Sequence, residues 1–386
     1  MNFREITVLL VDGADRQTLP LAKAYRDLGC KVATINGSKL DLGYASKYPT
    51  EKILDPLMKR SKTDHAQIIK RLLETGKYDV VVTTSDDTSE QLSLMKSEYE
   101  RYSHITVNAP DLFYMAYDKN KTMRICMEEG IPCPKTYLDI HKMDDLPLSD
   151  MQFPIVVKPA SSYGAMGFHR VDSEEDLKLL FSELGSRCSS YVFQEYIPQT
   201  GIQFECAMFV DNDNEVKASC VFSKTRWFPV SGGSSTCNYT VIRPDIVDSC
   251  TKLLKKIGWR GAADIDLIED PRDGTAKIME INPRVSGSVK VVLNSGVNIA
   301  RQMIELAFDE KVSSYVDYRP NVGLRCIHTD FLWFIKSSNR FRAKPSWFSW
   351  KNTTDQVWSL SDPLPFFTYS IQSLKRYGKE MKKRNG

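Results

Sequence analysis

The chain has 386 residues, of which 42% are hydrophobic and 26% charged, and its formal net charge is +3 at pH 7. This apolar content is sufficient for a large core, and the length indicates two or three globular units. No apolar run approaches the roughly 20 residues that cross a bilayer, and Asn2, Arg4 and Glu5 interrupt any signal-peptide pattern, so we expect a cytoplasmic protein.

Short apolar runs alternate with helical stretches in the first part of the chain. The predicted strands cover residues 6–11, 31–35, 78–83 and 104–108, with helices at 19–28 and 66–74. This alternation indicates a parallel sheet covered on both faces, and we assign the α/β unit to residues 1–115. Residues 84–87 follow a strand, so they either contact a ligand at the sheet edge or cap the next helix.

From residue 116 the pattern changes to a mixed α+β order. A helix is expected at 118–129, ending at Gly130, and another at 173–184. Strands are expected at 153–158, 168–171 and 191–197, and then through most of 203–281, which a helix at 244–257 interrupts. The nine cysteines show no C-x-x-C spacing, which indicates reduced core thiols.

Two carboxylates and an amide form the first candidate site. Glu280 and Asn282 alternate along one predicted strand and therefore share a face. The turn at 270–274 folds the strand at 261–268 back against it, which puts Asp266 opposite Glu280. Such an oxygen set suits magnesium, with Arg284 just beyond it to hold a phosphoryl group. The alternative is a hairpin with charged residues on its solvent face.

A Ser/Gly-rich loop after Lys158 is the second candidate site. Backbone N–H groups of this loop, at residues 161–167, can surround phosphate oxygens while the lysine supplies a point charge. An ordinary hairpin turn is the alternative. The strand end at 194–197 could present backbone groups to a purine edge.

These elements, in this order, resemble the ATP-grasp family. The matching run begins at Asp118 and Lys119 and ends at residues 280–284. The resemblance implies an N-terminal parallel α/β pre-ATP-grasp domain at 1–115. A two-subdomain ATP-grasp fold would follow at 116–310, with its lid at about 151–198, and then a C-terminal aromatic and basic extension at 311–386.

The resemblance also implies roles by position. ATP would be bound by Lys119, Lys158, Ser161, Ser162, Gly164, Gly167, Glu195, Ile197, Gln203 and Glu205. Asp266, Glu280 and Asn282 would hold Mg²⁺, with Mn²⁺ as an alternative ion, and Arg284 and Lys158 would stabilise the transferring phosphoryl group. The loop departs from the family pattern because serines occupy part of its glycine-rich stretch.

The implied activity is ATP-dependent carboxylate–amine ligation through an acyl phosphate, with ADP and phosphate as products. Surface-polysaccharide or secondary-metabolite biosynthesis is the context that the resemblance suggests. A carbamoyl-phosphate-type phosphotransferase or synthase, and an ATP-binding regulatory protein without turnover, are the alternatives.

The small-molecule carboxylate and amine substrates would lie beside the segment at 224–235. Arg226 could pair with a substrate carboxylate, and Gly232 and Gly233 could approach it closely. Ser286 and Ser288 could line the same pocket. The alternative is a strand and loop with an exposed arginine.

The last segment differs in charge from the rest. Residues 331–386 contain 11 Lys/Arg, 3 Asp/Glu and four of the six tryptophans. It either packs on the body through its aromatic residues, with a solvated basic helix at its end, or contacts the inner face of the membrane peripherally. We do not expect a nucleic-acid partner, and we keep a homodimer open.

Overall fold

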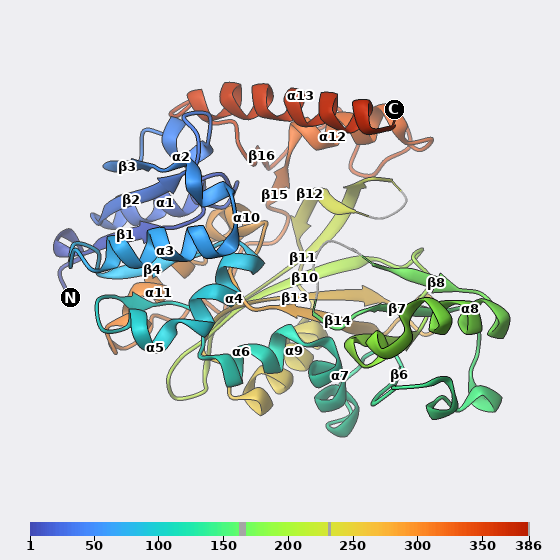
Figure 1. Ribbon diagram of the computed structural model, residues 1–386. Coiled ribbons are helices and arrows are strands. Elements are labelled where there is room, and N and C mark those ends of the chain that lie inside the picture. Colours follow the sequence, from blue (N-terminus) through green and yellow to red (C-terminus); the bar gives the residue numbers. More distant parts are fainter. Residues whose placement is uncertain (162–166, 231–232, 385–386) are drawn as a thin grey trace.

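The computed structural model describes residues 1–161, 167–230 and 233–384, with side chains described as far as residue 375. Three sheets organise the chain, and the central sheet lies between the other two (Figure 1). The mixed α/β architecture with an N-terminal parallel sheet confirms the predicted fold class. Ser162, Gly164 and Gly232, named above as candidate ligand contacts, lie outside the described residues.

The N-terminal sheet has the strand order β3-β2-β1-β4-β5, and all its pairs are parallel. Its strands are β1 (Thr7–Leu10), β2 (Lys31–Asn36), β3 (Glu51–Leu54), β4 (Val80–Val82) and β5 (His104–Ile105). Its helices are α1 (Thr18–Leu28), α2 (Leu42–Ala45), α3 (Lys62–Leu73), α4 (Asp86–Leu94), α5 (Lys96–Tyr99) and α6 (Pro110–Tyr117). The sequence pattern did not predict β3, because this edge strand is only half-buried and begins with two charged residues.

The central strand β1 shows why the sheet is covered on both faces. All four of its residues are buried, with Val8 and Leu10 in one apolar cluster and Leu9 in another. Alternate side chains of a strand point to opposite faces, so an uninterrupted apolar run is stable only between two layers.

The second sheet belongs to the predicted lid. Its strands pair antiparallel in the order β6-β9-β7-β8. They are β6 (Thr136–Tyr137), β7 (Ile155–Pro159), β8 (His169–Val171) and β9 (Tyr191–Glu195). Helix α8 (Glu174–Leu184) packs on this sheet through Leu177 and Leu180. Helix α7 (Lys119–Glu128) comes before the sheet in the chain.

The central sheet has seven strands in the order β14-β13-β10-β11-β12-β15-β16. They are β10 (Gln203–Val210), β11 (Val216–Phe228), β12 (Ser234–Thr240), β13 (Gly261–Glu269), β14 (Ala276–Asn282), β15 (Gly323–Arg325) and β16 (Thr353–Asp355). One face packs against the N-terminal domain through Phe209 and Phe222, whereas Cys206 and Met208 on the other face pack against α9 (Pro244–Ile257).

The C-terminal extension is part of the central sheet. Helices α10 (Val289–Ser295) and α11 (Ile299–Ala307) lead into β15 and β16, which extend the sheet from β12. Helix α13 (Leu364–Arg384) lies beside α2 and α12 (Ile327–Lys336) (Figure 1). The domain boundaries at 115 and 310 stay predictions, as does contact of residues 331–386 with a membrane. In the described part of the chain, no helix is long and apolar enough to span a bilayer.

The cysteines follow the sequence prediction. All nine are free thiols, and eight are buried, with Cys133 only partly so.

Candidate active site at the end of the central sheet

The hairpin of β13 and β14 has the predicted register. Asp266 is the cross-strand partner of Glu280, and Asp264 is the partner of Asn282. The Asn282 amide donates to Asp266 Oδ2 at 3.0 Å. The hairpin therefore brings two carboxylates and an amide together, as strand alternation and the turn at 270–274 predicted.

Two lysines from other elements neutralise these carboxylates. Lys119, the first residue of α7, lies 3.2 Å from Glu280 Oε2. Lys224 on β11 lies 2.5 Å from Asp266 Oδ1 and 3.1 Å from Glu205 Oε1 on β10. Sequence analysis did not assign Lys224 to this group. Its signal was a single lysine directly after a buried run of a central strand.

The electrostatics of the cluster differ from side chain to side chain. Burial, followed by repulsion from Lys119, lowers the pKa of Lys158 to about 8, although Glu280 and Asp266 oppose the shift. Burial also favours the neutral form of Lys224. The charges of Asp266 and Glu205 outweigh this effect and raise the pKa of Lys224. Lys224 is thus a fixed cation near neutral pH, whereas Lys158 is a cation that titrates.

The carboxyl groups of the cluster also repel one another. Burial raises the pKa of Glu205 and of Asp264, and one Asp264 oxygen is buried without a hydrogen bond. The pKa of Asp266 is lowered despite its burial, because Lys224 and the Asn282 amide stabilise the carboxylate. A site with surplus buried carboxyl oxygens is suited to a bound cation.

Arg284, just past β14, reaches across to the N-terminal domain. Its guanidinium pairs with both oxygens of Asp86, at 2.9 and 3.1 Å, and lies 3.4 Å from Asn282 Oδ1. Asp86 is the first residue of α4, which Ser85 caps by accepting from Thr88 N. The helix-cap interpretation of residues 84–87 is therefore correct, and the sequence did not reveal that Asp86 also orients Arg284.

The donor set fits a magnesium ion held mainly by phosphate. Asp266, Glu280 and Asn282 offer only oxygen ligands, as hard cations require. Within the residues that the structure describes, no group of three His, Cys, Asp or Glu side chains is arranged as a self-sufficient metal site. Two carboxylates and one amide would leave the remaining positions to phosphate oxygens and water.

The residues expected to contact ATP are distributed around this cluster. Lys158 lies on β7 and Gly167 follows the lid loop with a positive φ of 70°, while Ile197 is buried just after β9. Glu195 is held by Lys277 at 2.9 Å and by Arg272 at 2.8 Å. Its side chain is thus engaged by the protein, and its backbone N–H donates to Lys135 O at 2.9 Å.

Three further residues expected to bind ATP are Ser161, Gln203 and Glu205. Ser161 is exposed at the end of the described part of the loop, and Gln203 begins β10 with its amide bonded to Gln199 at 3.3 Å. Glu205 is buried in the centre of the cluster, between Lys224 and Ser286 Oγ at 3.1 Å.

The exposed-arginine interpretation of Arg226 is wrong. Its side chain is buried, and its guanidinium pairs with both oxygens of Asp330 on α12, at 2.8 and 3.2 Å. It also donates to Pro345 O at 3.1 Å. A substrate carboxylate would have to displace Asp330, so we do not carry Arg226 into the substrate pocket.

The other expected substrate contacts are buried near the cluster. Ser286 hydrogen-bonds Glu205, and Ser288 accepts from the Asn238 amide at 2.9 Å. Gly233 lies against the backbone of Phe228, where a Cβ would stand 2.4 Å from the Phe228 carbonyl oxygen. The close approach expected of this glycine is therefore made to the end of the neighbouring strand β11.

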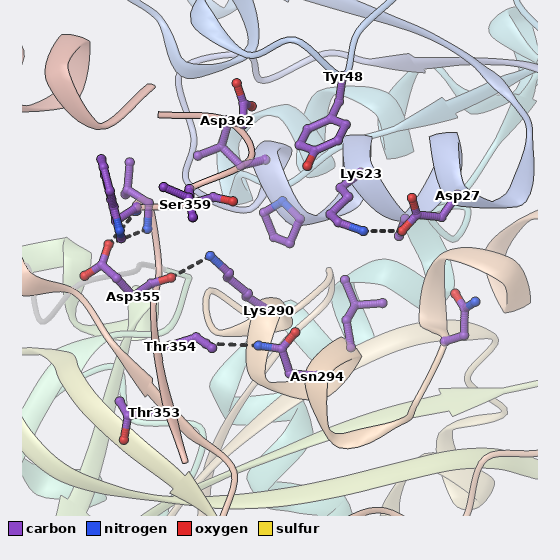
Figure 2. Close-up of a pocket in the computed structure, with 18 of the residues that line it drawn as sticks. Lys23, Asp27, Tyr48, Lys290, Asn294, Thr353, Thr354, Asp355, Ser359 and Asp362 are labelled. Atoms are coloured by element: carbon purple, nitrogen blue, oxygen red, sulfur yellow. Dashed lines mark hydrogen bonds and ion pairs between the residues drawn. The ribbon is translucent and has the colours of Figure 1, made fainter. Parts of the chain in front are cut away.

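A cavity of about 760 Å³ lies elsewhere, between α1, α10 and the segment that follows β16. Figure 2 shows Lys290 inside it, donating to the Asp355 carbonyl, with Lys23 and Tyr48 on the facing wall. None of the predicted site residues lines this cavity. We therefore take the charged cluster, and not this cavity, as the candidate active site.

Comparison with known proteins adds independent evidence. Residues 116–288 match the family model described as the ATP-grasp domain. The D-aspartate ligase of Enterococcus faecium is 28% identical over 259 residues, covering 61% of this chain and 60% of that protein. The carbamoyl phosphate synthase large chain of Archaeoglobus fulgidus is 22% identical over 307 residues, covering 74% of this chain and 27% of that protein.

A solved structure shares the fold over most of the chain. It is the biotin carboxylase domain dimer of 2-oxoglutarate carboxylase from Hydrogenobacter thermophilus, in complex with MgADP, ADP and bicarbonate. The TM-score is 0.68 at 16% identity, over 82% of this chain and 73% of that one. This chain spans less than two thirds of the length of both relatives matched by sequence.

Proposed function

We propose that this protein joins a carboxylate to an amine and consumes ATP in the reaction. The premise is that the chain is a member of the ATP-grasp superfamily through residues 116–288. The observation that carries the proposal is the β13–β14 hairpin, which aligns Asp266 with Glu280 beside Lys119 and Lys224. A carboxylate is a poor acyl donor, so the chemistry needs a phosphorylated intermediate.

The lysine–carboxylate pairs indicate how the site accepts its ligands. Lys119 pairs with Glu280, and Lys224 with Asp266 and Glu205. When a phosphate chain enters, Lys119 exchanges Glu280 for phosphate oxygens, which frees Glu280, and Lys158 supplies a further cation. Asp266, Glu280 and Asn282 would then hold Mg²⁺, which would offset the negative charge of the phosphate chain.

Arg284 acts at the transfer itself. Its guanidinium remains charged, because Asp86 and Asp264 outweigh its burial and raise the pKa. Asp86 fixes its orientation by the bidentate contact, so no reorganisation is needed when charge develops on the transferring phosphoryl group. The amine then attacks the acyl phosphate, and phosphate leaves.

The test is trapping of the acyl phosphate with hydroxylamine. Purified protein is incubated with MgATP, hydroxylamine and one carboxylate at a time, and both ADP and hydroxamate are measured. D-aspartate is the first carboxylate to offer, because a relative is a D-aspartate ligase. We expect ADP release that depends on the carboxylate and a matching yield of hydroxamate.

Two other outcomes have distinct meanings. Tight ATP binding without ADP release in the presence of any carboxylate would contradict the proposal and favour a regulatory protein. ADP release that requires bicarbonate alone would favour the carbamoyl-phosphate type of reaction, which the similarity to carbamoyl phosphate synthase also supports.

A further inference from the structure

Helix α13 has two apolar faces, and the first of them packs on the body of the protein. On this inner face the rings of Phe366 and Tyr369 contact His328 of α12, with centroids 4.7 and 4.9 Å away. Ser370 Oγ on the same side lies 2.8 Å from His328 Nε2. These contacts determine which side of α13 is turned inward and which is turned outward.

The outward side of α13 carries a second apolar stripe, which is exposed. Its four residues are spaced by three, four and three positions, so they share one side of the helix. Their side chains are 44–73% exposed, and they are Leu364, Phe367, Ile371 and Leu374. Figure 1 shows α13 along the outer edge of the molecule, on the side away from α7 and α9. A surface helix that packs along one side usually presents polar residues on the other, so this stripe requires an explanation.

Neighbouring elements enlarge this exposed stripe. On α12, Phe331 and Ile335 follow His328 by three and seven positions, so they lie on the side of α12 that meets α13. Both are about half exposed, at 51% and 49%. The ring of Trp358, itself exposed, lies edge-on to the ring of Phe367 with centroids 6.5 Å apart. We call the stripe of α13 together with these three side chains the outer surface of the extension.

The charges that this part of the chain exposes are positive. Residues 331–386 contain 11 Lys/Arg and 3 Asp/Glu. Asp355 and Asp362, the acidic residues of this segment whose side chains the structure describes, are buried and accept hydrogen bonds from the protein itself. Lys336 at the end of α12 and Lys375 directly after Leu374 are exposed. Among the described side chains of the segment, the negative charges are thus turned inward and the positive charges are left at the surface.

We propose that the outer surface of the extension docks on an anionic lipid surface. The apolar stripe inserts at the boundary between headgroups and acyl chains, and the exposed lysines lie against the lipid phosphates. An exposed apolar stripe beside a cluster of Lys/Arg is the combination by which a helix binds in the plane of a membrane interface. The aromatic rings of Phe367 and Trp358 suit the same depth. The inference concerns where the protein binds and is independent of the reaction that it catalyses.

Charge favours a lipid surface over a second copy of the chain. In a two-fold symmetric contact the same surface faces itself, so the exposed lysines of both copies would come together. No described carboxylate of the extension is exposed there to pair with them, so the contact would be repulsive. An anionic membrane instead offers phosphate groups to the lysines and an apolar layer to the stripe in one contact.

The first experiment measures binding of the full chain to vesicles by co-sedimentation. Vesicles of phosphatidylcholine alone are compared with phosphatidylcholine vesicles that contain about 30% phosphatidylglycerol. We expect at least about tenfold tighter binding to the anionic vesicles, and weaker binding when NaCl is raised from about 0.1 M to about 0.5 M. Absence of binding to the anionic vesicles would overturn the proposal.

The second experiment removes part of the apolar stripe. The double variant Phe367→Gln, Leu374→Gln should bind the anionic vesicles about tenfold more weakly or less still, because two large apolar side chains no longer enter the lipid. Its thermal unfolding should match that of the wild type, since both side chains are exposed. Unchanged vesicle binding by this variant would show that the stripe is not the docking surface.

The third experiment reverses two of the exposed charges. The variant Lys336→Glu, Lys375→Glu should lose about tenfold or more of its affinity for the anionic vesicles, and its weak affinity for phosphatidylcholine alone should stay unchanged. This pattern separates the electrostatic part of docking from the apolar part. A variant that retains the wild-type preference for anionic vesicles would exclude these lysines as the lipid-facing charges.

A matched control changes exposed apolar residues elsewhere. Leu179 on α8 and Ile242 after β12 are also exposed, so Leu179→Gln, Ile242→Gln should leave vesicle binding unchanged. Sedimentation velocity without lipid tests the second copy as the occupant. If the wild type is a dimer that Phe367→Gln, Leu374→Gln converts to a monomer, the outer surface is an interface between copies and the lipid proposal is wrong.

Discussion

Lys224 and Arg226 lie two residues apart on β11, yet they belong to two different charged clusters. Lys224 faces the active-site cluster, where it pairs with Asp266 of the β13–β14 hairpin and with Glu205 of β10. A bulge separates the two residues, and Arg226 joins Arg325 around Asp330 in what we call the extension cluster.

The two clusters differ in the kind of group that lacks a partner. Both Asp330 oxygens are taken up by arginines, and the Arg325 guanidinium lies 4.4 Å from the ring centroids of Trp347 and of Trp350. In the active-site cluster Asp264 retains an unpartnered oxygen. In the extension cluster two arginines share one carboxylate, and Arg325 Nη2 is buried without a hydrogen bond, whereas the active-site cluster keeps an acceptor for a ligand.

The largest expected effect is on turnover. Glu280→Ala removes a carboxylate of the β13–β14 hairpin that we propose holds Mg²⁺, and it should reduce the rate of ligation by roughly 10³-fold. Its folding should be preserved, because Glu280 is only partly buried. Steady-state ADP release and a urea unfolding curve measure the two quantities, and a variant with full activity would show that the metal assignment is wrong.

Asp330→Asn should have the opposite profile. It leaves two buried arginines without a carboxylate, so we expect the free energy of unfolding to fall by about 3–5 kcal/mol. ADP release per folded molecule should change far less than in Glu280→Ala. A loss of activity without a loss of stability would place the extension cluster in the catalytic machinery and break the comparison.

A third prediction concerns Lys158, whose pKa of about 8 lies within the pH range of an ordinary binding assay. A lysine is charged below its pKa, so raising the pH from 7 to 9 neutralises it and removes a phosphate partner. We expect the Kd for MgATP to rise by roughly tenfold or less over this interval. Binding titrations at both pH values measure this, and Lys158→Arg should flatten the dependence.

The smallest effect is expected for Asp264→Asn. The carboxyl of Asp264 is buried, and one of its oxygens has no hydrogen-bond partner. Replacing this carboxyl by an amide therefore removes few favourable interactions. The free energy of unfolding should change by less than about 1 kcal/mol, or rise. A loss as large as that of Asp330→Asn would show that both oxygens of Asp264 are engaged, contrary to this expectation.

Local patterns predicted much of this molecule. Strand alternation and the turn at 270–274 set Asp266 opposite Glu280, and the structure has that register. The continuous apolar run of β1 indicated a doubly covered sheet. These features depend on contacts between residues close in sequence, for which side-chain periodicity is sufficient.

Other features depend on contacts between distant segments. The sequence offered no sign that Asp86 orients Arg284, 198 residues further along the chain. Arg226 looked available for a substrate because its partner Asp330 is 104 residues away. The aromatic residues of the extension suggested a surface for a membrane or an anionic partner, whereas Trp347 packs against Arg325 in the structure.

The order of motifs and the periodicity of strands were sufficient to predict the mixed α/β architecture, whereas the phosphate- and metal-binding roles of individual side chains stay predictions. The tertiary structure alone decided which charges are satisfied by the protein itself and which remain for ligands. The reason is physical: a side chain carries its charge in the sequence, but its partner is fixed only when the sheet edge, α4 and the extension come together. That distinction separates Asp330, whose two oxygens are paired with arginines, from Asp264, which keeps an oxygen without a partner.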